Sequence, residues 1–126
     1  MKKKVYDIEI KLPLFKCHVL VLWDYTGKEI QKWGNAHGCS ITDKWVRDFE
    51  EWKENAEGVC MRLGEGNKDV LVWLKKKPEK MSEYGTLYHE LSHATDHIID
   101  DHLLEGTEVR AYIIEYLINE CNKVLW

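Results

Sequence analysis

Residues 87–98 have the pattern of an α-helix with two chemically different sides. At about 100° per residue, its apolar side chains fall on one stripe: Leu87, Leu91, Ala94 and Ile98. The opposite stripe carries His89, His93 and Asp96. This division constrains the fold, because the segment has to pack one side on a core and leave the other side accessible.

The polar stripe contains the spacing His89-Glu90-x-x-His93. Positions i and i+4 lie on one helix face, about 6 Å apart along the axis. Each imidazole can therefore place a nitrogen about 2.0–2.1 Å from one Zn²⁺. Glu90 lies beside the pair and could take a proton from a metal-bound water. The alternative is a solvated helix face that carries histidines by chance, and the apolar stripe opposite argues against it.

A catalytic zinc takes three protein ligands and keeps one position for water. His97 continues the i+4 series, but it lies about 12 Å from His89 along the axis, which suits a surface residue or a substrate contact. The third ligand is therefore expected in or just before the next helix, where Glu105 and Glu108 are the candidates. Geometry favours Glu108, because a carboxylate in the first helical turn is stabilised by the helix dipole. An ordinary first-turn glutamate is the alternative interpretation.

Two further side chains are candidates for supporting roles. Asp96 follows His93 by one turn and could accept a hydrogen bond from a ligand imidazole, which would fix its tautomer. A solvated acid is an equally good interpretation of Asp96. Tyr112 could donate a hydrogen bond to an oxyanion, although aromatic residues on helices more often pack in cores.

The hydrophobic pattern predicts strands first and two long helices last. Strands are expected over 5–10, 17–23, 59–63 and 69–76, with 29–33 returning as a hairpin strand after a turn at 24–28. Helices are expected over 41–55, over 82–99 with Ser82 as N-cap, and over 107–123. This order predicts an α+β fold with a small antiparallel or mixed sheet. A single domain is expected over residues 1–126.

Composition narrows the class of protein. With 44% hydrophobic and 32% charged residues, the chain is typical of a soluble globular protein. A formal charge of −4 argues against nucleic acid as the main partner. The longest apolar run, 19–23, is too short to span a membrane. The lysines at 2–4 precede no apolar segment, so we expect no export and a cytoplasmic location.

The run His89-Glu90-Leu91-Ser92-His93, followed by Glu108-Val109-Arg110-Ala111-Tyr112, resembles the arrangement of gluzincins. The match covers about residues 69–120. The short chain also resembles the small, minimal gluzincin-like zincin domains. The pattern is also similar to that of small uncharacterised zincin-like proteins, many of them from phages. The resemblance implies that His89, His93 and Glu108 bind zinc, with Glu90 as general base and later general acid.

In zincins an edge strand precedes the motif helix, and an extended peptide pairs with that edge. By this resemblance the 69–76 strand would bind substrate through Val70, Val72 and Leu74. The lysines that end this segment would suit an exposed edge. A plain structural strand is the alternative.

These observations predict a zinc-dependent hydrolase, a metallopeptidase acting on a peptide or protein. The second hypothesis is a non-catalytic protein-interaction module, such as a phage effector that meets a host protein, in which the metal is structural. A third is that the histidines bind no metal. The pattern leaves open whether the chain forms a homo-oligomer.

Overall fold

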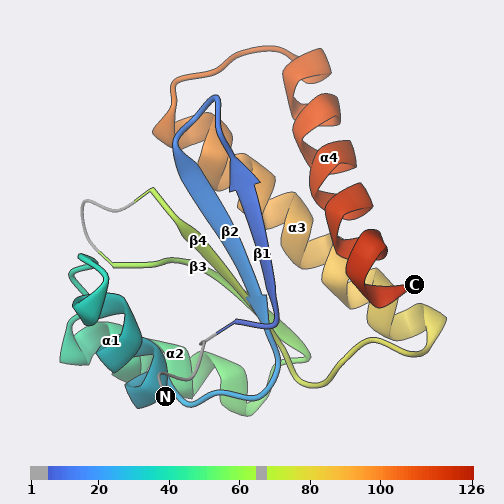
Figure 1. Ribbon diagram of the computed structural model, residues 1–126. Helices are drawn as coiled ribbons and strands as arrows, with labels where there is room; N and C mark the ends of the chain where they lie inside the picture. The colour runs from blue at the N-terminus through green and yellow to red at the C-terminus, as the bar shows by residue number, and fades with distance from the viewer. Residues whose placement is uncertain (1–5, 65–67) are drawn as a thin grey trace.

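A computed structural model describes residues 6–64 and 68–126 and is shown in Figure 1. The strands form one mixed sheet of four strands in the order β1-β2-β4-β3. Their bounds are β1 (Ile8–Leu12), β2 (Cys17–Leu22), β3 (Gly58–Arg62) and β4 (Val70–Leu74). β2 and β4 are parallel, and the outer strands β1 and β3 run antiparallel to their neighbours. The predicted α+β fold with a small mixed sheet is confirmed.

Helices cover both faces of the sheet (Figure 1). They are α1 (Gly27–Ala36), α2 (Asp43–Glu54), α3 (Met81–Asp101) and α4 (Thr107–Leu125). The helices predicted over 41–55, 82–99 and 107–123 are confirmed as α2, α3 and α4, with small shifts at their ends. Across both described ranges, no helix is long and apolar enough to cross a membrane.

Helix α3 starts one residue before the predicted cap, so Ser82 lies inside it. Its first turn is instead closed by Glu83, whose Oε1 accepts hydrogen bonds from the backbone N–H groups of Glu79 (3.0 Å) and Lys80 (2.9 Å). A carboxylate at this position also interacts favourably with the helix dipole.

The strand predicted over 29–33 is wrong, because these residues lie in α1. Thr26 Oγ1 accepts a hydrogen bond from Glu29 N (3.2 Å), and Glu29 Oε1 accepts one from Thr26 N (2.9 Å). This reciprocal capping box starts a helix within the stretch that was interpreted as a turn. Ile30 then packs into the core as a helical rather than a strand residue.

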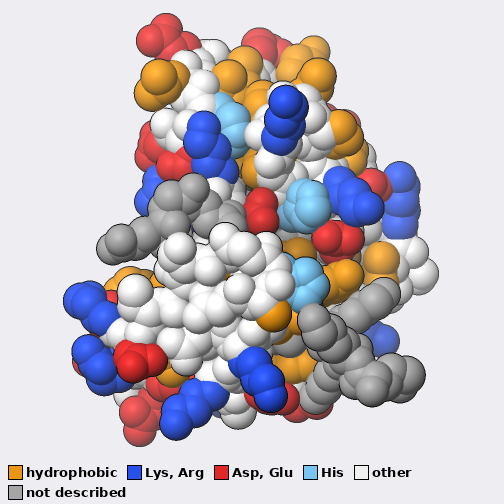
Figure 2. All heavy atoms as spheres, turned by 60° about the vertical axis from the view of Figure 1, so that its left-hand side comes forward, with side chains coloured by type: hydrophobic (Ala, Val, Ile, Leu, Met, Phe, Trp, Pro, Cys, Tyr) orange, Lys and Arg blue, Asp and Glu red, His pale blue; other side chains and the backbone are white. Residues whose placement is uncertain are grey.

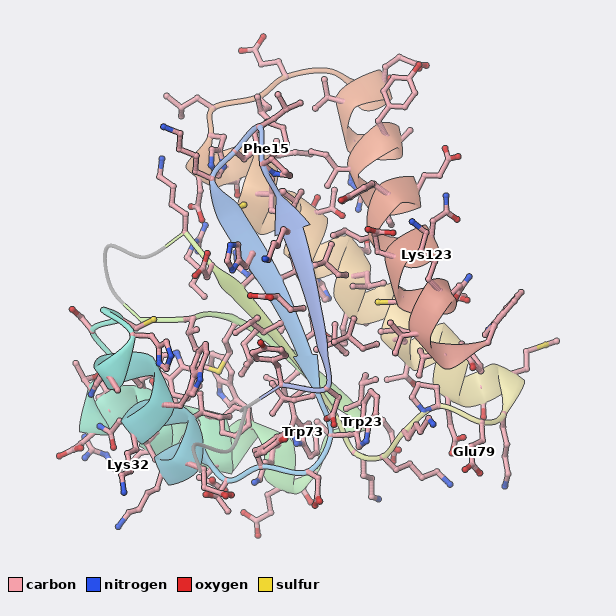
Figure 3. The ribbon with its side chains drawn as sticks, viewed as in Figure 1. Phe15, Trp23, Lys32, Trp73, Glu79 and Lys123 are labelled. Carbon is pink, nitrogen blue, oxygen red and sulfur yellow. The ribbon has the colours of Figure 1, made fainter. Side chains whose placement is uncertain are left out.

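Alternate residues of the strands enter two separate apolar clusters. On the α3/α4 face, Val19, Val21 and Val72 pack with the apolar stripe of α3. On the α1/α2 face, Leu20, Leu71 and Trp73 pack with residues such as Phe49. The Trp73 ring meets Phe49 edge-on with ring centroids 6.3 Å apart, and its place near the lower end of β4 is labelled in Figure 3.

The prediction that the 69–76 strand is an exposed edge is wrong. β4 pairs with β2 on one side and with β3 on the other. Val70, Val72 and Leu74 are 0%, 0% and 2% exposed, so they cannot bind a substrate. A continuous apolar run is typical of a strand covered on both faces, and the lysines follow after the strand has ended. The edge strand beside α3 is β3.

Candidate functional site

The two sides of α3 lie as the sequence pattern predicts. Its apolar stripe, Leu87, Leu91, Ala94 and Ile98, is fully buried at 0% exposure. His89 and His93 are exposed on the opposite side. The helix therefore anchors the site through its packed side and presents the motif on its other side.

His89 and His93 converge on one point in space. Their Nε2 atoms are 3.1 Å apart, and the ring planes are perpendicular with centroids separated by 4.7 Å. Two nitrogen ligands on a tetrahedral zinc, each bonded at about 2.0–2.1 Å, lie about 3.3 Å from each other. The spacing of the histidine pair thus fits two adjacent ligand positions of one zinc ion.

Glu90 is buried, with 7% exposure, against the edge strand β3. The carboxylate lies over Gly58, where an added Cβ would come within 2.9 Å of Glu90 Cγ and 3.1 Å of Glu90 Oε2. Burial raises the pKa of Glu90, and the neighbouring His89 and His93 partly oppose this shift. A carboxylate with a raised pKa is a stronger proton acceptor than an ordinary surface glutamate.

The predicted third ligand does not join the histidine pair. A hydrogen bond from Tyr88 OH to Asn122 Oδ1 (3.1 Å) and one from Arg110 Nε to Asp96 Oδ1 (3.0 Å) fix the two helices antiparallel. His89 and His93 lie between Tyr88 and Asp96 on α3, so they are level with the part of α4 that lies between Arg110 and Asn122. Glu108 lies before Arg110, outside that part of α4. Over residues 6–64 and 68–126, no group of three or more His, Cys, Asp or Glu side chains is arranged to hold a metal ion.

Glu105 lies in the connection before α4, and both candidate glutamates are exposed. Neither carboxylate is brought to the imidazole nitrogens by the fold. The part of the site that the structure assembles is the histidine pair with Glu90.

Asp96 does not orient a ligand imidazole. Its carboxylate forms the ion pair with Arg110 of α4, and the same guanidinium donates to Ser92 Oγ through Nη2. These contacts join α3 to α4, because Arg110 lies between the two polar residues of α3. The interpretation of Asp96 as a support for the histidines is therefore corrected to a helix–helix contact.

Tyr112 lies outside the site. It is 69% exposed and lines a separate apolar hollow with Leu14 and Phe15 of the β1–β2 turn. Figure 3 labels Phe15 at this turn. On the face shown in Figure 2, hydrophobic side chains gather at the upper end of the molecule. The expected contact of Tyr112 with an oxyanion is not supported by this position.

A groove lies beside the motif, between α2, β3 and α3. It has a volume of about 370 Å³. Its lining includes the following residues: Trp52, Gly58, Cys60, Glu90, His93 and His97. The sequence did not place Trp52, Gly58 or Cys60 here. His97, interpreted from the sequence as a surface residue or a substrate contact, lines this groove because it follows Glu90 by seven residues and shares its side of the helix.

Two features of the groove residues bear on chemistry. Burial lowers the pKa of His97, and the positive charge of Arg62 lowers it further, so the imidazole is neutral at neutral pH. Burial raises the pKa of the Cys60 thiol, with a further contribution from Glu90, so this cysteine is protonated. Cys60 is therefore a poor proton acceptor, whereas the Glu90 carboxylate and the neutral imidazole of His97 can both accept a proton.

The edge of β3 is open next to this groove. Among the described residues, β3 pairs with β4 alone. The hydrogen bond from Lys75 N to Glu57 O (2.9 Å) fixes the odd-numbered residues as those that bond to β4. Because antiparallel bonding alternates along a strand, Gly58 and Cys60 direct their N–H and C=O groups outward. This edge can accept another strand.

Comparison with protein-family models finds no family that matches the chain. Searches of curated proteins and of solved structures likewise find no significant match.

Proposed function

We propose that the protein is a zinc-dependent hydrolase of the peptidase type. The observation that carries this proposal is the 3.1 Å separation of the His89 and His93 Nε2 atoms next to the buried Glu90. Histidines placed on a helix by chance are not expected to have the spacing of two zinc ligands and also to lie next to a buried carboxylate at an open groove.

His89 and His93 would hold the metal. When bound, the metal would polarise the scissile carbonyl of the substrate and lower the pKa of the attacking water. Glu90 accepts the proton of the attacking water and later delivers it to the leaving amine. Its burial against Gly58 keeps the carboxylate in one place and favours its protonated form. Both properties are needed by a group that first takes a proton and then returns it.

The substrate we propose is an extended segment of polypeptide. Gly58 and Cys60 offer outward N–H and C=O groups to such a segment, which would add a strand to the sheet. Gly58 lies directly against Glu90, so a peptide on this edge passes the proposed general base. This assigns the substrate-binding role to β3 in place of β4.

Glu108 stays the predicted third ligand, with Glu105 as the alternative. The Arg110–Asp96 ion pair holds the start of α4 against α3, and Glu108 lies two residues before Arg110. Substitution of each glutamate by alanine tests this directly. Loss of a metal ligand lowers zinc affinity by orders of magnitude, whereas loss of a surface carboxylate leaves it unchanged.

A non-catalytic interaction module is the second candidate. It is favoured by the apolar hollow at Leu14, Phe15 and Tyr112, where Leu14 is 92% exposed. The role of the metal as a structural staple is less well supported. His89 and His93 lie outside both apolar clusters, so the core is complete without them.

The proposal is tested by incubating the zinc-loaded protein with an unfolded protein substrate and sequencing the fragments. We expect cleavage that is lost in Glu90→Gln, with zinc retained, and kept in Glu115→Gln, which alters an exposed glutamate of α4. Cleavage that persists in Glu90→Gln, or no cleavage by the wild-type protein, would contradict the proposal.

A further inference from the structure

A second hollow extends the groove along β3. It has a volume of about 390 Å³ and reaches Trp45 and Arg62. The two hollows share the lining residues Trp52, Cys60 and His97. They therefore form one continuous groove that starts at Glu90 and His93.

Helix α3 follows β3 along the whole length of this groove. At one end Glu90 lies over Gly58, and at the other Arg62 Nη2 forms an ion pair with Asp101 Oδ1 at 2.9 Å. From Glu90 to Asp101 the helix rises about 17 Å, and β3 spans about 13 Å. A peptide paired with β3 at Gly58 and Cys60 would therefore run from the proposed catalytic carboxylate toward the second hollow, where the outward carbonyl of Arg62 already accepts a hydrogen bond from Trp45 Nε1.

Aromatic rings from α2 form the wall opposite α3. Trp52 is 54% exposed and borders both hollows. Trp45 Nε1 donates a hydrogen bond to the carbonyl oxygen of Arg62 (2.8 Å), so the polar atom of this indole is already satisfied. Its ring stacks on Phe49 with centroids 5.3 Å apart, which holds it in place. At Trp45 the wall thus offers ring surface rather than a free hydrogen-bonding group.

The charged groups at the second hollow already have partners. Lys44 Nζ pairs with Asp48 Oδ2 at 2.7 Å, and Arg62 pairs with Asp101. A charged ligand side chain would have to compete with these ion pairs. An apolar side chain would instead gain contact with the rings at no electrostatic cost, as in most small-molecule and peptide pockets.

We propose that Trp45, Trp52, Cys60 and His97 form a specificity subsite that takes a large aliphatic or aromatic side chain of an extended peptide. The inference rests on the proposed function, because the peptide occupant is argued from the open β3 edge and from continuity of the groove with Glu90. Side chains of an added strand alternate between its two faces, so the preference would fall at one position of the peptide.

The test uses a synthetic library of blocked octapeptides with every position randomised. Zinc-loaded Glu90→Gln protein captures peptides, and mass spectrometry reports which residue types are enriched at each position. We expect enrichment of Phe, Trp, Leu and Met at one position on the order of 10-fold. Trp52→Ala in the same background should abolish this enrichment. The matched control Trp126→Ala alters another exposed tryptophan, at the C-terminus, and should keep it.

The outcomes separate the subsite from the hydrolase. Selective capture that depends on Trp52 supports the subsite. If the wild-type protein nevertheless cleaves no library member, that absence of cleavage refutes the hydrolase and leaves the subsite standing. Cleavage by the wild-type protein without positional preference refutes the subsite alone. No capture, enrichment of charged residues, or a preference unaffected by Trp52→Ala also overturns the subsite.

Discussion

The two sides of helix α3 are made of the same backbone yet serve different purposes. One side contributes Leu87, Leu91, Ala94 and Ile98, all at 0% exposure, to the apolar cluster under the sheet. The other side carries an exposed histidine pair and a buried carboxylate that the core does not require. We therefore expect substitutions of the exposed histidines to leave stability nearly unchanged, whereas substitutions of the buried stripe lower it.

The packing side should respond most strongly to substitution. Leu91→Ala removes a fully buried side chain and leaves a cavity, so we expect the free energy of unfolding to fall by about 2–5 kcal/mol. His89→Ala, two residues earlier on the exposed side, should change it by less than about 0.5 kcal/mol. Chemical denaturation measures both. Equal losses would show that the two sides are not independent.

Gly58→Ala tests how tightly the site side is packed on β3. An added Cβ would lie 2.9 Å from Glu90 Cγ and 3.0 Å from Thr86 Cγ2. We expect a loss of about 1–3 kcal/mol from overpacking, measured by denaturation. The loss should shrink in a Glu90→Ala background, because the contacts with the Glu90 side chain are then gone, although the contact with Thr86 Cγ2 remains. An undiminished loss in the double variant would exclude Glu90 as its cause.

Glu90→Gln should stabilise the zinc-free protein at neutral pH. Burial raises the pKa of Glu90, so the folded state is penalised once the carboxylate ionises. The gain should be present at pH 7, where the wild-type carboxylate ionises more readily in the unfolded state than in the folded state. It should disappear as the pH falls below the ordinary glutamate range, where the wild-type side chain is protonated. Thermal unfolding of wild type and Glu90→Gln in the presence of a chelator, measured across this pH range, tests the prediction. A lower stability of Glu90→Gln at pH 7 would contradict it.

The smallest effect is expected at the N-terminus of α3. The hydrogen bond from Lys76 and those from the backbone N–H groups of Lys80 and Glu79 lower the pKa of Glu83 from 4.5 to about 2. Glu83→Gln should therefore lower Tm slightly at pH 7, and the difference should close as the pH falls from 4.5 to about 2. Glu51→Gln, an exposed acid of α2, should show no such pH dependence.

Local patterns predicted α3 and its histidine pair well, because the i, i+4 relation follows from helix geometry alone. The predicted ends of α2 and α4 also lie within two residues of the ends in the structure. The helix at 27–36 was missed because Thr26 and Glu29, which form its capping box, stood in a stretch rich in turn residues.

Relations between distant segments could not be predicted. The place of β4 inside the sheet depends on its pairing with β2, for example Val19 with Val70, and no local pattern encodes that order. The groove wall at Trp52 and Cys60 arises in the same way, from packing of α2 and β3 beside α3. Glu108 was predicted as the third ligand from its place in the first helical turn and from the resemblance to gluzincins, whereas its position is set by how α4 docks through Arg110.

The most direct test of the account is the zinc content of the purified protein, measured by mass spectrometry of the metal beside a His93→Ala variant. We predict one zinc per wild-type chain, its loss from His93→Ala, and an unchanged fold in that variant by circular dichroism. A wild-type protein that binds no stoichiometric zinc, or a variant that keeps it, would contradict the assignment of the histidine pair as the metal centre.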